Sequence, residues 1–236
     1  AATTGAPRTD RSAHRRARLR WDAVRRILPP ALPMGAVMAL IAFQTAIPRL
    51  FLEAWHGTEA VGYFSAVLYP LATGTIIVGA LGQSALPRLS QYFRDNRPAF
   101  LRLLGRLVGI GLLLGVGAVA VAWVVGGPLL TIAYTRAFAA YQPELVIMAG
   151  GTIFLFVSSF FGYALTAARQ FYIQPIMVTL SCAAALGASA WLIPTMGVTG
   201  AAWAYSIKAV VSCMASAACL AWAMSRSGLH ESAGGS

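Results

Sequence analysis

The sequence predicts an all-α membrane protein, a six-transmembrane-helix bundle with both termini cytoplasmic. Three observations predict this class. Of the 236 residues, 58% are hydrophobic and only 11% are charged, whereas soluble domains carry about 25% charged residues. Apolar runs recur along the chain, and a run of about 18 residues or more can cross a bilayer. Basic residues gather on one side of these runs, as they do at the cytoplasmic ends of membrane helices.

The polar ends of the chain flank the transmembrane part. Residues 1–26 contain eight arginines and are predicted to form a basic cytoplasmic linker or leader. Within it, the part from Ala17 to Arg26 forms either a basic amphipathic helix on anionic lipid or a plain solvated tail. Residues 27–225 are predicted to form the six-helix transmembrane region, and residues 226–236 a disordered cytoplasmic tail.

Six apolar runs define the predicted spans. The first begins among three prolines, which a helix tolerates in its first turn, and the third is rich in glycine. There the pairs Gly105/Gly109 and Gly111/Gly115 have the small-xxx-small spacing that lets two helices approach closely. The spans cover about residues 28–48, 61–86, 107–125, 145–167, 172–193 and 201–224.

The distribution of arginine and lysine orients these spans. Fifteen of these residues fall in segments on one side, and two, Arg49 and Arg136, fall on the other. This bias places both termini in the cytoplasm. On the same side, Asn96 is predicted to cap a helix. Residues 95–107 are predicted to lie along the inner surface with their arginines at headgroup level, before the chain turns into the third span.

Polar side chains in the second span share one face of the predicted helix. At about 100° per residue they occupy an arc of roughly 100°. A membrane helix gains little by turning polar groups to lipid. The face therefore either lines a path through the membrane or holds helices together, and the sequence leaves both interpretations open. This polar stripe consists of Ser65, Tyr69, Thr73, Gln83 and Ser84.

Lys208 is a charge deep within an apolar run. It lies seven residues after Ala201, which places it roughly 10 Å along the helix. A central cation costs about 2.5–3.5 kcal/mol and usually marks a functional role or a partner. The alternative is that its side chain extends outward to the headgroups. Tyr205, Ser212 and Ser216 share its face of the helix, which favours the functional interpretation.

Further cations lie at the ends of the spans. Arg49, near Gln44, either contacts an anionic substrate or anchors its helix to outer headgroups, and Arg88 and Arg169 lie at inner boundaries, where the charge bias alone explains most arginines. Together they form a path suited to a phosphate-bearing ligand, which arginine can bind bidentately. The predicted substrate-binding residues are Lys208, Arg49, Gln44, Tyr69, Thr73, Gln83, Arg88, Tyr205 and Ser212.

The sequence does not favour an enzyme, a cofactor, a metal site or nucleic-acid binding. Its three histidines lie outside the apolar spans, which also lack an acidic pair, a phosphate-binding loop and a nucleophile elbow. Cys182, Cys213 and Cys219 all lie in apolar runs, where buried inert thiols are expected. The net charge is +11, but the basic residues are not interleaved with aromatic residues as they are in a nucleic-acid-binding groove.

Several stretches resemble a known family of transporters. They include GTEAVGYFSAVLYPLATG, ALPRLSQYFRDNRPAFLRLLGRL and LIPTMGVTGAAWAYSI. These resemble the C-terminal lobe of Wzx-type polysaccharide and oligosaccharide-lipid flippases, which belong to the multidrug/oligosaccharidyl-lipid/polysaccharide exporter superfamily. The resemblance covers about residues 28–224.

The resemblance implies a fold and a function. Family members have two six-helix lobes around a cation-lined cavity. They move an undecaprenyl-pyrophosphate-linked oligosaccharide across the bacterial cytoplasmic (inner) membrane by alternating access, for surface polysaccharide export. The chain is then expected to be one lobe of a two-lobe transporter, similar to the C-terminal half. Its expected partners are the lipid-linked glycan, membrane lipids and an N-terminal six-helix lobe from the same gene or a separate chain. Lys208 would suit the pyrophosphate.

Two alternatives remain open at the level of sequence. One is a self-contained six-helix porter that works as a homodimer. The other is the drug/cation antiporter branch of the same superfamily, which a membrane-embedded carboxylate would favour. The predicted spans contain no such carboxylate.

Overall fold

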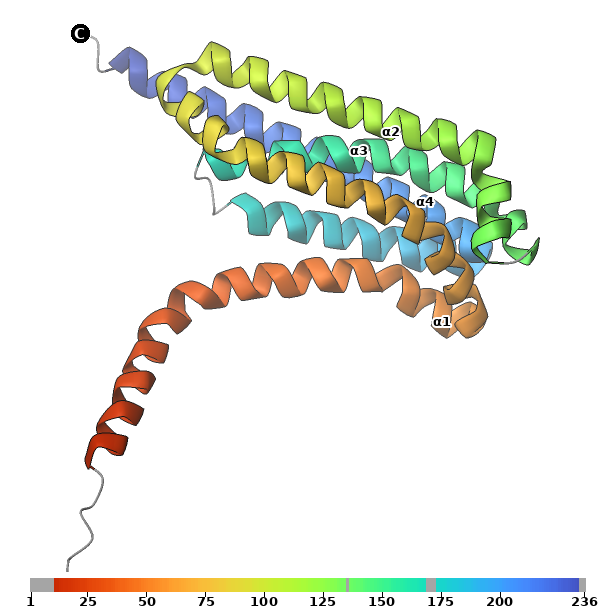
Figure 1. Cartoon of the computed structure of the whole chain (residues 1–236), viewed down its shortest axis with the longest axis horizontal. Helices are drawn as coiled ribbons and strands as arrows, with labels where there is room; N and C mark the ends of the chain where they lie inside the picture. Colours follow the sequence, from red (N-terminus) through yellow and green to blue (C-terminus); the bar gives the residue numbers. More distant parts are fainter. Residues whose placement is uncertain (1–10, 135, 169–172, 234–236) are drawn as a thin grey trace, which may run out of the picture. The chain divides into compact units, whose positions relative to one another are not determined.

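The computed structural model describes the backbone of residues 11–134, 136–168 and 173–233, and the side chains of 38–134, 136–168 and 174–224. All regular structure in these ranges is helical, which confirms the predicted all-α class (Figure 1). The elements are α1 (Arg11–Asp95), α2 (Arg97–Ala133), the short 3₁₀ helix η1 (Arg136–Tyr141), α3 (Gln142–Ala167) and α4 (Ile173–Ala233).

The chain divides into two compact units between Ala39 and Leu40. The helix α1 begins at Arg11, within the predicted leader, and α4 ends at Ala233, within the predicted tail.

Four helices, rather than the predicted six, are long and apolar enough to cross a membrane in the described part of the chain. Their mean hydropathy lies between 1.7 and 2.4. The difference arises because α1 and α4 each include a stretch predicted to be a loop between spans, and a single glycine interrupts the helix there. The six-span count and the orientation of the termini therefore do not follow from the helices themselves. The four stretches are Met38–Asp95, Arg97–Ala133, Arg136–Ala167 and Gln174–Met224.

Single glycines break the two longest helices. Gly57 has φ 80° and ψ 177°, and Gly197 has φ 57° and ψ −126°. Glycine adopts such positive φ values at little cost because it has no Cβ. Figure 1 shows the ribbon reversing direction at both places. The two reversals lie against each other, since His56 Nε2 is 2.8 Å from the Ile193 carbonyl oxygen.

The start of α2 confirms one predicted detail and corrects another. The Asn96 side chain accepts a hydrogen bond from the Ala99 amide at 3.0 Å, so Asn96 caps the helix as predicted. However, α2 runs without a break from Arg97 to Ala133. Residues 95–107 therefore do not form a separate segment that turns into the third span. The capped start leads straight into the apolar run, because no residue there stops the helix.

The helix α2 also ends later in the chain than predicted. The third span was expected to stop at about residue 125, but the helix continues through Pro128 to Ala133. A proline removes one backbone donor and displaces the carbonyl of the preceding turn. The Gln142 side chain donates a hydrogen bond to the nearby Trp123 carbonyl at 2.8 Å. A side chain of α3 thus donates to a backbone carbonyl of α2 close to the proline.

Small residues let α3 pack closely against its neighbours. A Cβ on Gly115 of α2 would lie 2.8 Å from the Ile153 Cα of α3, and one on Gly151 of α3 would lie 2.8 Å from the Ser206 Cα of α4. Gly111 similarly contacts Phe160, so the predicted close approach is confirmed for one glycine pair. It is absent for the pair Gly105/Gly109, which has nothing within 4 Å among the described atoms.

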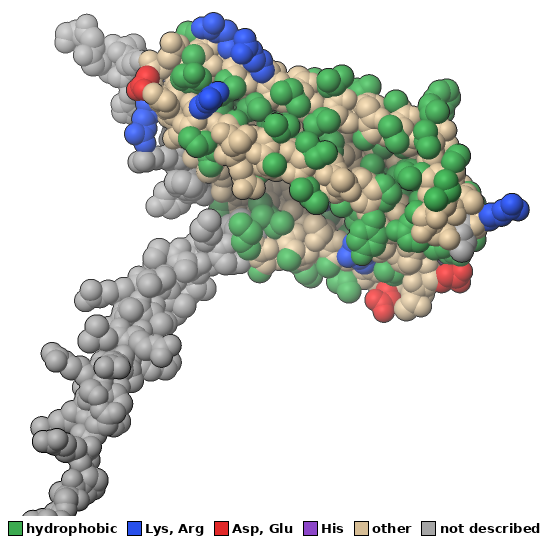
Figure 2. All heavy atoms as spheres, viewed as in Figure 1, with side chains coloured by type: hydrophobic (Ala, Val, Ile, Leu, Met, Phe, Trp, Pro, Cys, Tyr) green, Lys and Arg blue, Asp and Glu red, His purple; other side chains and the backbone are tan. Residues whose placement is uncertain are grey.

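Hydrophobic side chains fill the interior and also cover the exterior. One core cluster includes Phe64, Met148 and Ala201, and a second includes Leu89, Phe100 and others towards the α1–α2 junction. Outside, Ile132 is 86% exposed, and Figure 2 shows apolar side chains spread over the visible face of the helices. Such a surface suits a lipid solvent, in which apolar side chains face the acyl chains.

Candidate functional site

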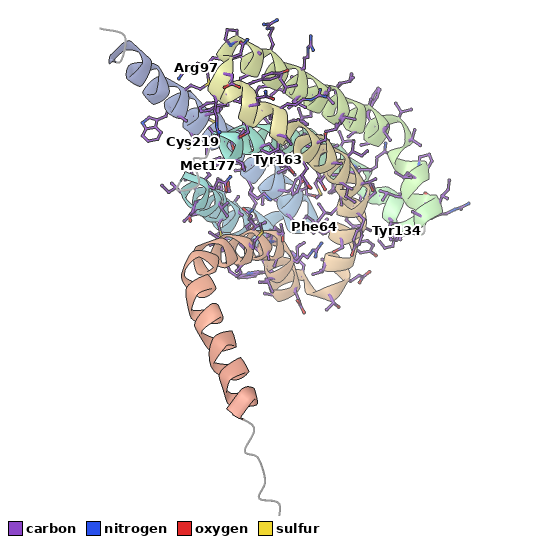
Figure 3. All side chains as sticks on the ribbon, turned by 60° about the vertical axis from the view of Figure 1, so that its left-hand side comes forward. Phe64, Arg97, Tyr134, Tyr163, Met177 and Cys219 are labelled. Carbon is purple, nitrogen blue, oxygen red and sulfur yellow. The ribbon has the colours of Figure 1, made fainter. Side chains whose placement is uncertain are left out.

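A cavity of about 180 Å³ is lined in part by Lys208. It lies between the first segment of α1, the segment after Gly57, α3 and both segments of α4. Its wall is mostly apolar, with a few polar residues among the lining. The lining residues are Gln44, Thr45, Pro48, Phe64, Leu68, Ala72, Thr75, Leu155, Ala185, Ala204, Tyr205 and Lys208. Phe64, labelled in Figure 3, lies inside the bundle.

Lys208 is buried in this cavity without a countercharge. The residue is 8% exposed, and none of the residues that line the cavity is acidic. Its Nζ lies 5.4 Å from the ring centroid of Tyr205, within the range of a cation–π contact. A buried cation is expensive unless an anion or a hydrogen-bonding partner compensates it. The side chain therefore does not extend outward, and an anionic group entering the cavity would stabilise it.

Gln44 and Arg49 add further unpaired polar atoms on the first segment of α1. Gln44 lines the cavity, and within the described part its Oε1 is buried without a hydrogen-bond partner. The Nε of Arg49 is likewise buried without a partner, although Arg49 does not line the cavity. Buried polar atoms in native proteins are usually paired. The two atoms are thus available to a ligand or to another part of the protein.

Tyr205 and Ser212 of α4 contact α3. The Tyr205 hydroxyl is 3.4 Å from the Thr152 Oγ1. Ser158 of α3 lies 2.9 Å from the Ser212 Oγ and 3.0 Å from the Ser216 Oγ. Hydroxyl pairs of this kind hold membrane helices together. Lys208 and Tyr205 face the cavity, while Ser212 belongs to the interface between α3 and α4.

The polar stripe of α1 lies on the surface of this chain. Tyr69 is 60% exposed, and Thr73, Gln83 and Ser84 are also exposed. None of them lines the Lys208 cavity. Among the described residues, the stripe therefore neither holds helices of this chain together nor shares the cavity of the buried lysine.

Arg88 lies apart from Lys208, in a second hollow where α1 ends and α2 begins. The structure thus brings together three of the nine predicted site residues, Gln44, Tyr205 and Lys208. Arg49 lies one turn from the cavity residue Thr45. The remaining five lie elsewhere.

Sequence reasoning missed some contributors to the cavity. Thr45 and Thr75 line it, and each donates its hydroxyl to a carbonyl of its own helix, at 2.7 and 2.6 Å. Thr75 lies off the polar stripe, on the face that also carries the apolar lining residues. A search for polar residues opposite Lys208, rather than for one continuous stripe, could have found it.

A larger cavity of about 560 Å³ lies beside the two glycine reversals. It is lined by polar and aromatic groups that include His56, Glu59 and Tyr141. No predicted site residue lies in it. Glu144 is buried in the first turn of α3 and accepts a hydrogen bond from Thr199 at 2.7 Å.

Comparison with known proteins identifies the family. The family model described as lipid II flippase MurJ matches residues 8–235. Over 182 residues the chain is 26% identical to the capsular polysaccharide biosynthesis protein CapF of Staphylococcus aureus. This alignment covers 77% of the present chain and 46% of CapF. The chain thus spans about half the length of the curated relative it matches. No solved structure matches.

These matches confirm the resemblance to lipid-linked flippases that the sequence motifs indicated. The matched family consists of transporters rather than catalysts. Together with the long apolar helices, the match makes this a multi-pass membrane protein. Because the family model covers nearly the whole chain, the chain belongs to the lipid II flippase MurJ family.

Proposed function

We propose that the chain is one lobe of a transporter that flips an undecaprenyl-pyrophosphate-linked oligosaccharide across the bacterial cytoplasmic membrane, for surface polysaccharide export. Membership of a flippase family supports the transport of a lipid-linked glycan. The relative CapF, named for capsular polysaccharide biosynthesis, supports a role in surface polysaccharide. The buried Lys208 supports an anionic group on the substrate.

In this proposal the lobe has six membrane spans. The reversals at Gly57 and Gly197 divide the two longest helices, so four elements supply six antiparallel segments. A helix of about 17–25 residues is enough to cross the hydrocarbon core. The excess of arginine and lysine on one side supports a cytoplasmic location for both termini. The basic end with Arg88 and Arg102 then faces the cytoplasm, and Arg136 faces outward.

A second lobe completes the transport path. The chain covers 46% of CapF, which leaves room for another lobe in a transporter of that size. The exposed stripe with Tyr69, Thr73 and Gln83 is costly if it faces lipid. It therefore faces the second lobe or a water-filled cavity between the lobes. Alternating access would expose this cavity first to one side of the membrane and then to the other.

The observation that carries the proposal is the uncompensated cation in the Lys208 cavity. A diphosphate carries the negative countercharge that the lining of the Lys208 cavity does not supply. A cavity of about 180 Å³ is smaller than a typical pocket of about 300–1,000 Å³ for a whole ligand. The cavity thus fits a charged group of the substrate rather than the entire lipid-linked glycan.

The test uses the full-length protein in cells that depend on it for glycan export. Lys208→Gln should lower export at least about tenfold, as expected when a buried charge contact is lost. Lys208→Arg should retain more export than Lys208→Gln. Ile207→Ala, on the neighbouring exposed face of α4, is the matched control and should leave export unchanged. Unchanged export in Lys208→Gln, at equal amounts of protein in the membrane, would refute the proposal.

A further inference from the structure

A second concave site lies where α1 ends and α2 begins. Its volume is about 230 Å³. Figure 2 shows blue side chains gathered at this end of the bundle, and Figure 3 marks the end by the label of Arg97. The residues that line this arginine hollow are Arg88, Tyr92, Ala99, Arg102, Leu103 and Arg106. None of them lines the Lys208 cavity.

Rigid packing beneath the hollow fixes the two helices that supply the arginines. Leu89 of α1 is 0% exposed and Phe100 of α2 is 1% exposed, and both belong to one core cluster. The Phe93 and Phe100 rings meet edge to face, with centroids 5.3 Å apart. Asn96 caps α2 directly at the junction. The backbones of α1 and α2 that carry Arg88 and Arg102 are therefore held at a fixed spacing. The Nε of Arg102 donates a hydrogen bond to the Pro98 carbonyl of its own helix at 3.3 Å, and its two terminal nitrogens remain as further donors.

The charge in the hollow is of one sign. Three guanidinium groups line it, and no aspartate or glutamate does. The nearest acidic residue along the chain, Asp95, is exposed and does not line the hollow. The positive-inside rule requires arginines at this end of the helices but does not require three of them to surround one concavity. Like charges held close together repel unless an anion lies between them.

We propose that the arginine hollow binds a membrane lipid whose headgroup carries two phosphate groups. Arginine forms bidentate hydrogen bonds to phosphate, and the Tyr92 hydroxyl supplies a further donor. Basic pockets at the cytoplasmic end of membrane helices are known to suit such headgroups. At about 230 Å³ the hollow accommodates a headgroup, while the acyl or prenyl chain lies along the apolar exterior. It is a separate site from the cavity around Lys208.

Two lipids present this chemistry, the diphosphate of a lipid-linked substrate and the two phosphates of cardiolipin. The first source rests on the proposed function and the second does not. The experiment measures binding alone, so that a failure of transport does not affect it. The purified full chain is reconstituted in nanodiscs of phosphatidylcholine. Undecaprenyl diphosphate, cardiolipin, undecaprenol and inorganic pyrophosphate are then titrated as separate probes.

The wild-type chain should bind one or both diphosphate-bearing lipids more tightly than undecaprenol. The variant Arg88→Gln/Arg102→Gln should weaken this binding at least about tenfold. The control Arg94→Gln/Arg136→Gln removes the same charge from exposed positions outside the hollow and should change the affinity less than about twofold. Preference for undecaprenyl diphosphate identifies the substrate lipid as the source, and preference for cardiolipin identifies the phospholipid.

Three results would overturn the proposal. The first is equal affinity in wild type and in Arg88→Gln/Arg102→Gln. The second is an equal loss in the control, which would mean that only net charge matters. The third is binding of undecaprenol as tight as that of its diphosphate. Should the double variant fold poorly by size-exclusion chromatography, Arg102→Lys replaces it. That variant retains the charge but lacks the bidentate geometry, and should bind less tightly than wild type.

Discussion

The close contact of α2 with α3 at Gly115 predicts how a substitution there changes the free energy of unfolding. A Cβ at Gly115 would lie 2.8 Å from the Cα of Ile153 and 2.9 Å from its Cγ1. The Cα belongs to the backbone of α3 and cannot rotate away. Gly115→Ala therefore forces the two helices apart. Gly109, on the same helix, has nothing within 4 Å of its Cβ position among the described atoms.

The magnitude follows from two opposing terms. Replacing glycine by alanine inside a helix gains about 0.8–1.0 kcal/mol at either position. Overpacking a tight contact costs typically about 1–3 kcal/mol, and this cost arises only at Gly115. Gly109→Ala should thus raise the free energy of unfolding slightly, and Gly115→Ala should lower it by up to about 2 kcal/mol. The difference between the variants, about 1–3 kcal/mol, isolates the contact with Ile153.

The assay is reversible unfolding in mixed detergent micelles with increasing sodium dodecyl sulfate. Far-ultraviolet circular dichroism reports the helices, and the fluorescence of the six tryptophans reports packing. The reasoning would be refuted if both variants changed stability equally, or if Gly109→Ala were the less stable of the two.

Two further predictions concern the bundle and its orientation. Ser158→Ala removes the hydroxyl shared with Ser212 and Ser216 and should cost about 0.6 kcal/mol, while Ser159→Ala, whose hydroxyl donates to the Leu155 carbonyl of its own helix, should cost less. Equal costs in the same unfolding assay would count against the contact between helices. For the orientation, His56→Cys and Arg136→Cys in a cysteine-free background should react with an impermeant thiol reagent from outside the cell. Reaction only from the inside would contradict the proposed topology.

The sequence predicted the helical class well because the hydropathy signal is strong and local. An apolar run satisfies its backbone in lipid only as a helix, so the runs became helices. The connections were harder to predict. The chain contains 23 glycines, yet only Gly57 and Gly197 have positive φ among the described residues. Which glycine reverses the chain depends on contacts such as that between His56 and the Ile193 carbonyl, which come from distant parts of the sequence.

The candidate site was predictable in part for a similar reason. Lys208 stood out because a charge in an apolar run is rare, and Tyr205 followed from helical spacing on the same face. The polar residues across the cavity, Thr45 and Thr75, carry single hydroxyl groups within apolar runs, and they stand out only when polar residues are sought opposite Lys208. The polar stripe that includes Tyr69 was recognised from its spacing, but its surroundings were not. A periodic pattern identifies a face of a helix, but it does not identify the neighbour of that face.

Translocation by the purified full-length protein in liposomes tests most directly whether Lys208 contacts the substrate during transport. A fluorescent undecaprenyl-diphosphate-linked glycan is placed in one leaflet, and its appearance in the other is measured by accessibility to a soluble glycan-binding protein. We expect rapid translocation by wild type and by Ile207→Ala, and a rate at least about tenfold lower for Lys208→Gln. Equal rates for wild type and Lys208→Gln would contradict this expectation.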